Sequence, residues 1–302
     1  MSIEEAGANV TTIATPPDTS VITLTAEETA LVTEGTGRIA EGPDERFDDP
    51  GLRAAARSTI LECWHGLPDL ADRVSVTIDR EPYFALIRGV PLASPSAFFV
   101  ALASSWGEIT EPYQRSWSRA VYHIRPRSDR VIAGSGVLNQ YLHTDGTHWP
   151  RPNDLTCLLC LCADQRGGGR SRLLSLDRLR AELSAAHPGV LDVLTAEAVP
   201  WALDENLGAG MDLAPVFTDD RVRWLKHTID QATGAGATLP DPVADALRTL
   251  ESFVERCPGT FEFPLGPGDL LVVNNRRCMH ARTPIPNPAS SRRHLARIKV
   301  NR

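Results

Sequence analysis

From about residue 119 to its C-terminus, the chain consists mainly of short strand-like runs separated by turn-forming Gly, Pro and Asp. The runs are rich in β-branched and aromatic residues, as strands are. In order they read RAVYHIRP, RVIAGSGVLNQYL, LTCLLCLCA, APVF, RVRWLK, TFEFPL, DLLVVNN and HLARIKV. Many short strands with turn signals between them favour a β-sandwich or β-barrel over a doubly wound parallel sheet. We therefore predict a mainly β fold.

Helical patterns flank and interrupt these strands. Thr25 and Glu28 form a capping-box pattern, and Ser94 before Pro95 is expected to cap another helix. The predicted helices cover about residues 26–39, 52–65, 95–107, 176–186, 189–197 and 241–256, and YFALIRGV at 83–90 is a predicted strand. Residues 1–20 lack periodicity and are expected to form a flexible arm. Residues 21–302 are expected to form a single domain with flanking helices.

The charge balance disfavours two classes of partner. The 302 residues include 31 Lys and Arg against 38 Asp and Glu, which gives a net charge of -7. Such a protein repels nucleic-acid phosphates and anionic membrane surfaces. No stretch is long and apolar enough to span a bilayer, and the N-terminus lacks the pattern of a signal peptide. We expect a cytoplasmic protein with a small-molecule partner, while the oligomeric state is not predicted.

Three of the six cysteines, Cys157, Cys160 and Cys162, have a spacing that resembles a metal motif. A structural zinc site needs a second close pair of ligands, and Cys257 and Cys278 do not form one. The run CLLCLC is better explained as a buried strand in which cysteine acts as a small hydrophobic residue. A chain of this length needs no disulfide framework.

His143 and Asp145, in YLHTDG, lie two residues apart and so project from the same face of an extended segment. An imidazole beside a carboxylate supplies two ligands of a metal site, although a solvated turn before Gly146 explains the pair alone more simply. His280 follows the turn GPGD and the predicted strand LLVV, just past its end. Two histidines and one carboxylate form the facial triad of non-haem iron(II) oxygenases, which leaves positions open for a 2-oxo acid and O2.

Two arginines near the C-terminus indicate an anion site. Arg293 and Arg297, in SRRHLARIKV, share one face of a strand-like segment with Leu295. A guanidinium that points into a β-core needs a carboxylate partner, which it binds through two parallel hydrogen bonds. The alternative is that both arginines lie on the surface.

Together HTDG, GPGDLLVVNNRRCMHAR and RRHLAR resemble the taurine dioxygenase and clavaminate synthase superfamily of iron(II)- and 2-oxoglutarate-dependent oxygenases. The resemblance extends from about residue 85 to the C-terminus and implies a double-stranded β-helix, the cupin-like jelly roll. It implies that His143, Asp145 and His280 bind Fe(II). It also implies that Arg293, which lies 13 residues after His280 (293 − 280), binds the C5 carboxylate of 2-oxoglutarate.

The same resemblance suggests further site residues. The hydroxyl of Ser171, in GGRS, would assist Arg293 at the C5 carboxylate. Arg297 matches an arginine that lies near the 2-oxo-acid carboxylate or an anionic group of the substrate. Asn139, four residues before the first ligand, would face the substrate. Trp149 either forms a wall of the pocket or simply packs.

The activity implied is hydroxylation of an unactivated C–H bond in a small amino-acid-like or other small-molecule substrate, with 2-oxoglutarate and O2 as co-substrates. Desaturation, epoxidation and cyclisation stay open, because they depend on where the substrate carbon lies. A metal-dependent hydrolase is disfavoured by Arg293 with Ser171, and a non-catalytic binding protein by the complete ligand set. The acidic residues of segment 201–215 either receive a cationic substrate beneath a lid or belong to a solvated loop. These are Asp204, Glu205 and Asp212.

Overall fold

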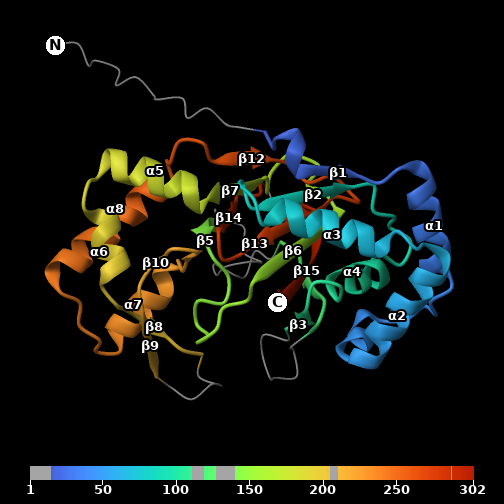
Figure 1. Ribbon diagram of the computed structural model, residues 1–302, viewed down its shortest axis with the longest axis horizontal. Coiled ribbons are helices and arrows are strands. Elements are labelled where there is room, and N and C mark those ends of the chain that lie inside the picture. Colours follow the sequence, from blue (N-terminus) through green and yellow to red (C-terminus); the bar gives the residue numbers. More distant parts are fainter. Residues whose placement is uncertain (1–14, 111–118, 127–139, 205–209, 287) are drawn as a thin grey trace, which may run out of the picture.

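The computed structural model of this protein describes residues 15–110, 119–126, 140–204, 210–286 and 288–302. Two β-sheets form the centre, with four helices on either side (Figure 1). The N-terminal group of helices is α1 (Ala26–Gly37), α2 (Pro50–Cys63), α3 (Leu67–Ile78) and α4 (Pro95–Ala103). The second group is α5 (Leu176–Ala186), α6 (Val190–Ala196), α7 (Lys226–Gly234) and α8 (Asp241–Val254). Within the described residues, no helix has the length and apolar character needed to cross a bilayer.

The larger sheet has seven strands, and all of its pairs are antiparallel except β1 with β2. Its main path runs β1 (Val21–Thr23), β2 (Phe84–Arg88), β13 (Leu270–Asn274), β6 (Leu155–Cys162), β15 (His294–Asn301) and β3 (Glu108–Ile109), and β4 (Tyr122–Ile124) also pairs with β15. Both faces of this sheet are buried. Leu270 and Val272 of β13 pack beneath the first helix group, whereas Leu271 and Val273 point toward the second sheet. Burial on both faces explains why these strands are continuous apolar runs in the sequence.

The smaller sheet is antiparallel throughout and has four strands. Its order is β12 (Phe261–Phe263), β7 (Ser171–Ser175), β14 (Cys278–Arg282) and β5 (Gln140–His143). Its outer face, which includes Leu174 and Met279, packs against α5, α6 and α8. Its inner face meets the larger sheet in a shared apolar cluster that contains Leu173, Cys278 and Leu271. The two facing sheets confirm the predicted mainly β, jelly-roll fold with flanking helices.

Two short hairpins complete the strand inventory of the described residues. They are β8 (Val199–Ala202) with β9 (Met211–Ala214), and β10 (Phe217–Thr218) with β11 (Arg221–Val222). The strands of the first hairpin include six residues of the segment 201–215, at 201–202 and 211–214, so the predicted lid or solvated loop is partly regular strand. Glu205 of that segment lies outside the described residues.

Several sequence-based expectations about local structure are confirmed. The Thr25 hydroxyl and the Glu28 carboxylate form a reciprocal capping box at the start of α1. The Ser175 side chain accepts the backbone N–H of Arg178 at the start of α5. The CLLCLC run is strand β6, and all six cysteines are free.

Two local expectations are wrong. Ser94 precedes α4 in a left-handed conformation (φ 52°), so its side chain makes no capping hydrogen bond. The predicted strand RVRWLK ends at Val222, and its Lys226 begins helix α7 instead. His280 follows the LLVV strand as expected, at the centre of a separate strand, β14. Of the predicted N-terminal arm, residues 1–14 lie outside the described residues, and Asp18–Ser20 forms a 3-10 turn before β1.

Candidate metal centre

Two strands and the loop between β5 and β6 bring His143, Asp145 and His280 together. His143 is the last residue of β5 and is the register partner of His280 on β14. Their ring centroids lie 4.5 Å apart. Asp145 follows β5 by two residues, and all three buried side chains offer ligand atoms within 4.8 Å of one another. The structure thus gathers the three predicted ligands at one end of the space between the sheets.

The loop that carries Asp145 is fixed by the amide of Asn275, which follows β13. The backbone N–H of Asp145 donates to Asn275 Oδ1 over 2.7 Å. Asn275 Nδ2 in turn donates to the carbonyl oxygens of Asp145 (3.0 Å) and Asn153 (2.8 Å). These hydrogen bonds hold Asp145 in place through its backbone, which leaves its carboxylate free to serve the site.

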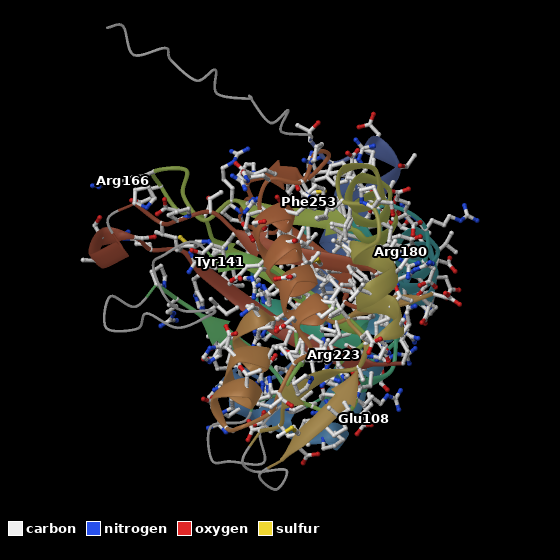
Figure 2. The ribbon with its side chains drawn as sticks, turned by 90° about the vertical axis from the view of Figure 1, so that its left-hand side faces the viewer. Glu108, Tyr141, Arg166, Arg180, Arg223 and Phe253 are labelled. Atoms are coloured by element: carbon white, nitrogen blue, oxygen red, sulfur yellow. The ribbon has the colours of Figure 1, made fainter. Side chains whose placement is uncertain are left out.

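Arg223 holds the following part of the same loop (labelled in Figure 2). Its guanidinium donates to the carbonyl oxygen of Thr147, at 2.6 Å from Nη2, and to that of Trp149, at 3.1 Å. It also stacks on the ring of Trp201 and pairs with the carboxylate of Asp212. Asp212 is therefore engaged in a structural ion pair, which argues against the idea that it receives a cationic substrate.

The carboxylate of Asp145 is surrounded by donors. Its Oδ2 accepts a hydrogen bond from Thr156 Oγ1 at 2.9 Å, and its Oδ1 lies 3.3 Å from Lys299 Nζ and 3.9 Å from Arg297 Nη1. Burial favours the neutral acid, but the charges of Lys299 and Arg297 outweigh it and hold the pKa of Asp145 well below its ordinary value. Asp145 is therefore an anion at neutral pH.

Both histidines are neutral at neutral pH. Burial lowers the pKa of His143, and burial together with the nearby His143 lowers the pKa of His280 to about 3. His143 Nδ1 lies 2.8 Å from the carbonyl oxygen of Tyr141, so Nδ1–H donates there and Nε2 keeps its lone pair. The Nε2 atoms of His143 and His280 lie 3.9 Å and 3.7 Å from the Asp145 carboxylate.

This donor set fits a divalent transition metal. Two neutral imidazoles and one carboxylate converge from one side, and a carbonyl oxygen orients one ring, as is usual for a metal-binding histidine. Among the described residues, Nδ1 of His280 is buried and has no hydrogen-bond partner. Three protein ligands of this kind on one face are typical of non-haem Fe(II).

A pocket next to His280 contains the predicted 2-oxoglutarate residues. Ser171, Arg293 and Arg297 all line it, together with Arg282, which was not predicted. Arg282 and Ser171 are register partners on β14 and β7, so both face inward. The remaining lining residues are Ile124, Leu158, Ala281 and Leu295, beside His280 itself.

Arg293 is buried at this pocket, and its guanidinium packs closely against the backbone of Gly169. Its Nη2 donates to the Gly169 carbonyl oxygen at 3.2 Å. A Cβ added to Gly169 would lie 2.6 Å from Arg293 Nε, so no larger residue fits there without displacing the guanidinium. Burial lowers the pKa of Arg293, and among the described residues no carboxylate forms an ion pair with it. A buried guanidinium without an anionic partner of its own is suited to bind a ligand carboxylate.

The two predicted substrate residues are only partly accounted for. Asn139 lies outside the described residues. Trp149 is buried beside the metal centre, with the centroid of its ring 5.2 Å from Lys299 Nζ, and it does not line the pocket of Arg293. Lys299, Asn275 and Arg223 were not predicted as site residues.

A jelly roll that carries two histidines on neighbouring strands and a carboxylate in the loop after one of them is typical of mononuclear non-haem iron oxygenases. Within this class, the chain belongs to the taurine catabolism dioxygenase TauD, TfdA family, whose model matches residues 80–299. The family is described as one of dioxygenases, and the ligand set of His143, Asp145 and His280 fits a metal of that class.

Individual proteins agree with this assignment. A trimethyllysine dioxygenase from Meyerozyma guilliermondii is 27% identical over 172 residues, which are 53% of this chain and 41% of that protein. The match therefore spans less than half the length of this curated relative. The crystal structure of an asparagine oxygenase with Fe(II), 2S,3S-3-hydroxyasparagine and succinate has a TM-score of 0.76, with 20% identity and 93% of each chain covered. The oxygenase OrfP with Fe and alpha-ketoglutaric acid has a TM-score of 0.73 at 20% identity, over 95% of this chain and 94% of that one. These two structures share the fold.

Proposed function

We propose that this chain hydroxylates an unactivated C–H bond of a small amino-acid-like substrate. His143, Asp145 and His280 hold Fe(II) in this proposal, and Arg293 with Ser171 binds the C5 carboxylate of 2-oxoglutarate. The observation that carries the proposal is the continuity between the two sites, because His280 is both a member of the ligand cluster and a lining residue of the pocket that contains Arg293. A molecule anchored at Arg293 can therefore reach a metal at His280.

Bound Fe(II) supplies the activation of O2, in which 2-oxoglutarate becomes succinate and CO2 while one oxygen atom enters the substrate. The protein residues provide position and charge. The Arg293 guanidinium matches the planar geometry of a carboxylate and can bind it with two hydrogen bonds. The Ser171 hydroxyl, also buried at this pocket, can donate a third. Arg297 lies between this anchor and Asp145, where a second anionic group would bind.

The proposed substrate class rests on three related proteins. One structural neighbour holds a hydroxylated asparagine, and OrfP has been crystallised with (3S)-hydroxy-L-Arg. The curated relative is a trimethyllysine dioxygenase. All three names refer to amino acids or their derivatives, so free amino acids are the first substrates to test here.

The test is a substrate screen under turnover conditions. The purified chain would be incubated with Fe(II), ascorbate, 2-oxoglutarate and air, with each of the common amino acids and N-trimethyllysine in turn. Succinate release identifies an accepted substrate, and mass spectrometry then shows whether one oxygen atom is gained or two hydrogen atoms are lost. The Asp145→Ala variant measures the background. Equal succinate release by the variant and the wild-type chain would contradict the proposed metal ligands.

A further inference from the structure

We infer that Asp164 is a positioning residue for Arg293, and that it thereby sets how strongly the chain prefers a 2-oxo acid with a second carboxylate. The inference rests on the proposed function and deepens it, since it takes Arg293 as the anchor of the C5 carboxylate of 2-oxoglutarate. Asp164 lies in the turn between β6 and β7, in which Arg166 is labelled in Figure 2. It acts through the two chain segments that hold Arg293 and does not touch the ligand itself.

The first support is the contact between the Arg293 guanidinium and the backbone of this turn. The Nη2 atom of Arg293 donates to the Gly169 carbonyl oxygen at 3.2 Å, and a Cβ on Gly169 would lie 2.6 Å from its Nε. Gly169 lies at the end of the turn, two residues before β7 begins. The position of the turn therefore determines where the guanidinium can lie.

The second support is that Asp164 joins this turn to the segment that carries Arg293. Its Oδ2 accepts the backbone N–H of Gly168 at 2.8 Å, and its Oδ1 accepts the hydroxyl of Ser291 at 2.6 Å. The Ser291 oxygen in turn accepts the backbone N–H of Arg293 at 3.2 Å. One carboxylate thus bridges the residue before Gly169 and the residue that holds the backbone of Arg293.

Asp164 is suited to this bridge because it is ionised at neutral pH. Burial alone would raise its pKa, but the hydrogen bonds from Ser291 and from the Gly168 N–H outweigh that effect and lower the pKa. An ionised carboxylate accepts from both partners at once, and hydrogen bonds to a charged acceptor are stronger than those between neutral groups. The bridge can therefore hold the turn against Arg293 before a ligand binds.

The other side of the turn is attached to the chain that follows β14. The Gly169 N–H donates to the Pro284 carbonyl oxygen at 3.1 Å, and the Arg170 N–H donates to Thr283 Oγ1 at 3.0 Å. These contacts align the turn with the smaller sheet and do not reach the segment that carries Arg293. Because Asp164 provides a link to that segment, its loss should let the turn and the segment move apart while both remain folded.

A displaced guanidinium should affect only a ligand that has a distal carboxylate. 2-Oxoglutarate and 2-oxobutyrate share the 2-oxo acid group, but only 2-oxoglutarate has a second carboxylate for Arg293. Loss of Asp164 should therefore lower the affinity for 2-oxoglutarate and leave the affinity for 2-oxobutyrate unchanged. A general weakening of the fold or of the metal centre would lower both affinities together.

The experiment measures the dissociation constants of 2-oxoglutarate and 2-oxobutyrate for the anaerobic, Co(II)-loaded full chain, by calorimetry and Co(II) absorption. In Asp164→Ala we expect 2-oxoglutarate to bind about tenfold more weakly, while 2-oxobutyrate binds as in the wild type. Ser291→Ala breaks the same bridge and should have a similar effect, and it also tests the inference if Asp164→Ala does not fold. The double variant should be little worse than either single variant, because the two residues share one contact.

Two control variants separate the bridge from the charge and from the stability of a turn. Asp164→Asn removes the charge but can still accept the Gly168 N–H and donate to Ser291 Oγ, so its affinity for 2-oxoglutarate should stay within about threefold of the wild type. Asp269→Ala removes a carboxylate that likewise accepts a glycine N–H, from Gly266 at 2.8 Å, in a turn outside the pocket lining. It should leave the affinities for both oxo acids unchanged.

The outcomes separate this inference from the proposed function. If Co(II) does not bind, or if Arg293→Met binds 2-oxoglutarate as tightly as the wild type, the proposed function is wrong. If Arg293→Met binds it weakly but Asp164→Ala and Ser291→Ala do not, or lose affinity for both oxo acids equally, only the role of Asp164 is overturned. The same holds if Asp164→Asn or Asp269→Ala is as weak as Asp164→Ala. A loss confined to 2-oxoglutarate in the two bridge variants supports both.

Discussion

His143 and His280 are register partners on neighbouring antiparallel strands, although they are 137 residues apart in the chain (280 − 143). Backbone hydrogen bonds between β5 and β14 therefore determine how far apart the two imidazoles lie. Because His280 occupies the centre of β14, which pairs with a strand on each side, its position is more constrained than that of a loop residue. The two rings are preorganised before a metal binds, which is the property that a catalytic metal site requires.

Replacement of His280 by alanine should abolish metal-dependent turnover while the fold remains. The substitution removes one of three proposed ligands, so we expect a loss well beyond the roughly 10- to 100-fold that is typical of residues that only support a ligand. Succinate release and the bound metal content would be measured together. His227→Gln is a matched control, because His227 is exposed on α7. Wild-type metal content in His280→Ala would contradict the assignment.

The anchor for 2-oxoglutarate can be tested directly at Arg293 and, without changing a charged residue, at Gly169. Arg293→Met should raise the KM for 2-oxoglutarate by about 10- to 100-fold, the usual value of a lost charged hydrogen bond. Gly169→Ala should raise the same KM, because the new Cβ would lie 2.6 Å from Arg293 Nε and displace the guanidinium.

The control for this experiment is Gly167→Ala. Gly167 also has a positive φ, of 76° against 65° for Gly169, but its Cβ would meet nothing within 4 Å. Backbone strain is therefore similar in the two variants, and only Gly169→Ala crowds Arg293. An equal effect of both substitutions on KM would show that strain, and not displacement of Arg293, is responsible.

The sequence predicted the parts of the protein whose signals are local. The apolar run LLVV is visible because β13 is buried on both faces, and the cap at Ser175 is a contact between residues three apart. His143 and Asp145 lie within one short motif. Helix α3 also has a local signal, since Leu67, Leu70 and Val74 are buried at helical spacing.

The residues that the sequence did not reveal act across the fold. Lys299 is a single lysine in the run RIKV, and nothing local indicates that it faces Asp145 across the site. Asn275 and Arg223 hold the ligand loop through contacts with residues more than 70 positions away. Such contacts depend on strand register and sheet packing, which one sequence without an alignment does not show.

The loop between β5 and β6 should lose stability when Arg223 is replaced by methionine. The substitution leaves the buried carbonyl oxygens of Thr147 and Trp149 without their donor, at an expected cost of about 2–3 kcal/mol. Urea unfolding of the metal-free chain would measure this cost. Asp212→Asn removes only the partly exposed partner of Arg223 and should cost less than about 1 kcal/mol. Equal costs in the two variants would show that the ion pair, and not the carbonyl contacts, provides the stability.

The metal-free protein should lose stability when the pH falls from about 6.5 to about 4. Burial lowers the pKa of His294 to about 4, from an ordinary value of 6.5. The unfolded chain therefore binds a proton in this window that the folded chain does not, so acid favours unfolding; above pH 6.5 the ring is neutral in both states and the effect vanishes. His280, with a pKa of about 3, should contribute in the same direction over a wider range.

Urea unfolding at several pH values would measure the slope of the free energy of unfolding with pH. In His294→Gln that slope should decrease near pH 5 by about 0.5 to 1 bound proton. An unaltered slope in His294→Gln would mean that His294 takes up its proton equally in the folded and unfolded chain.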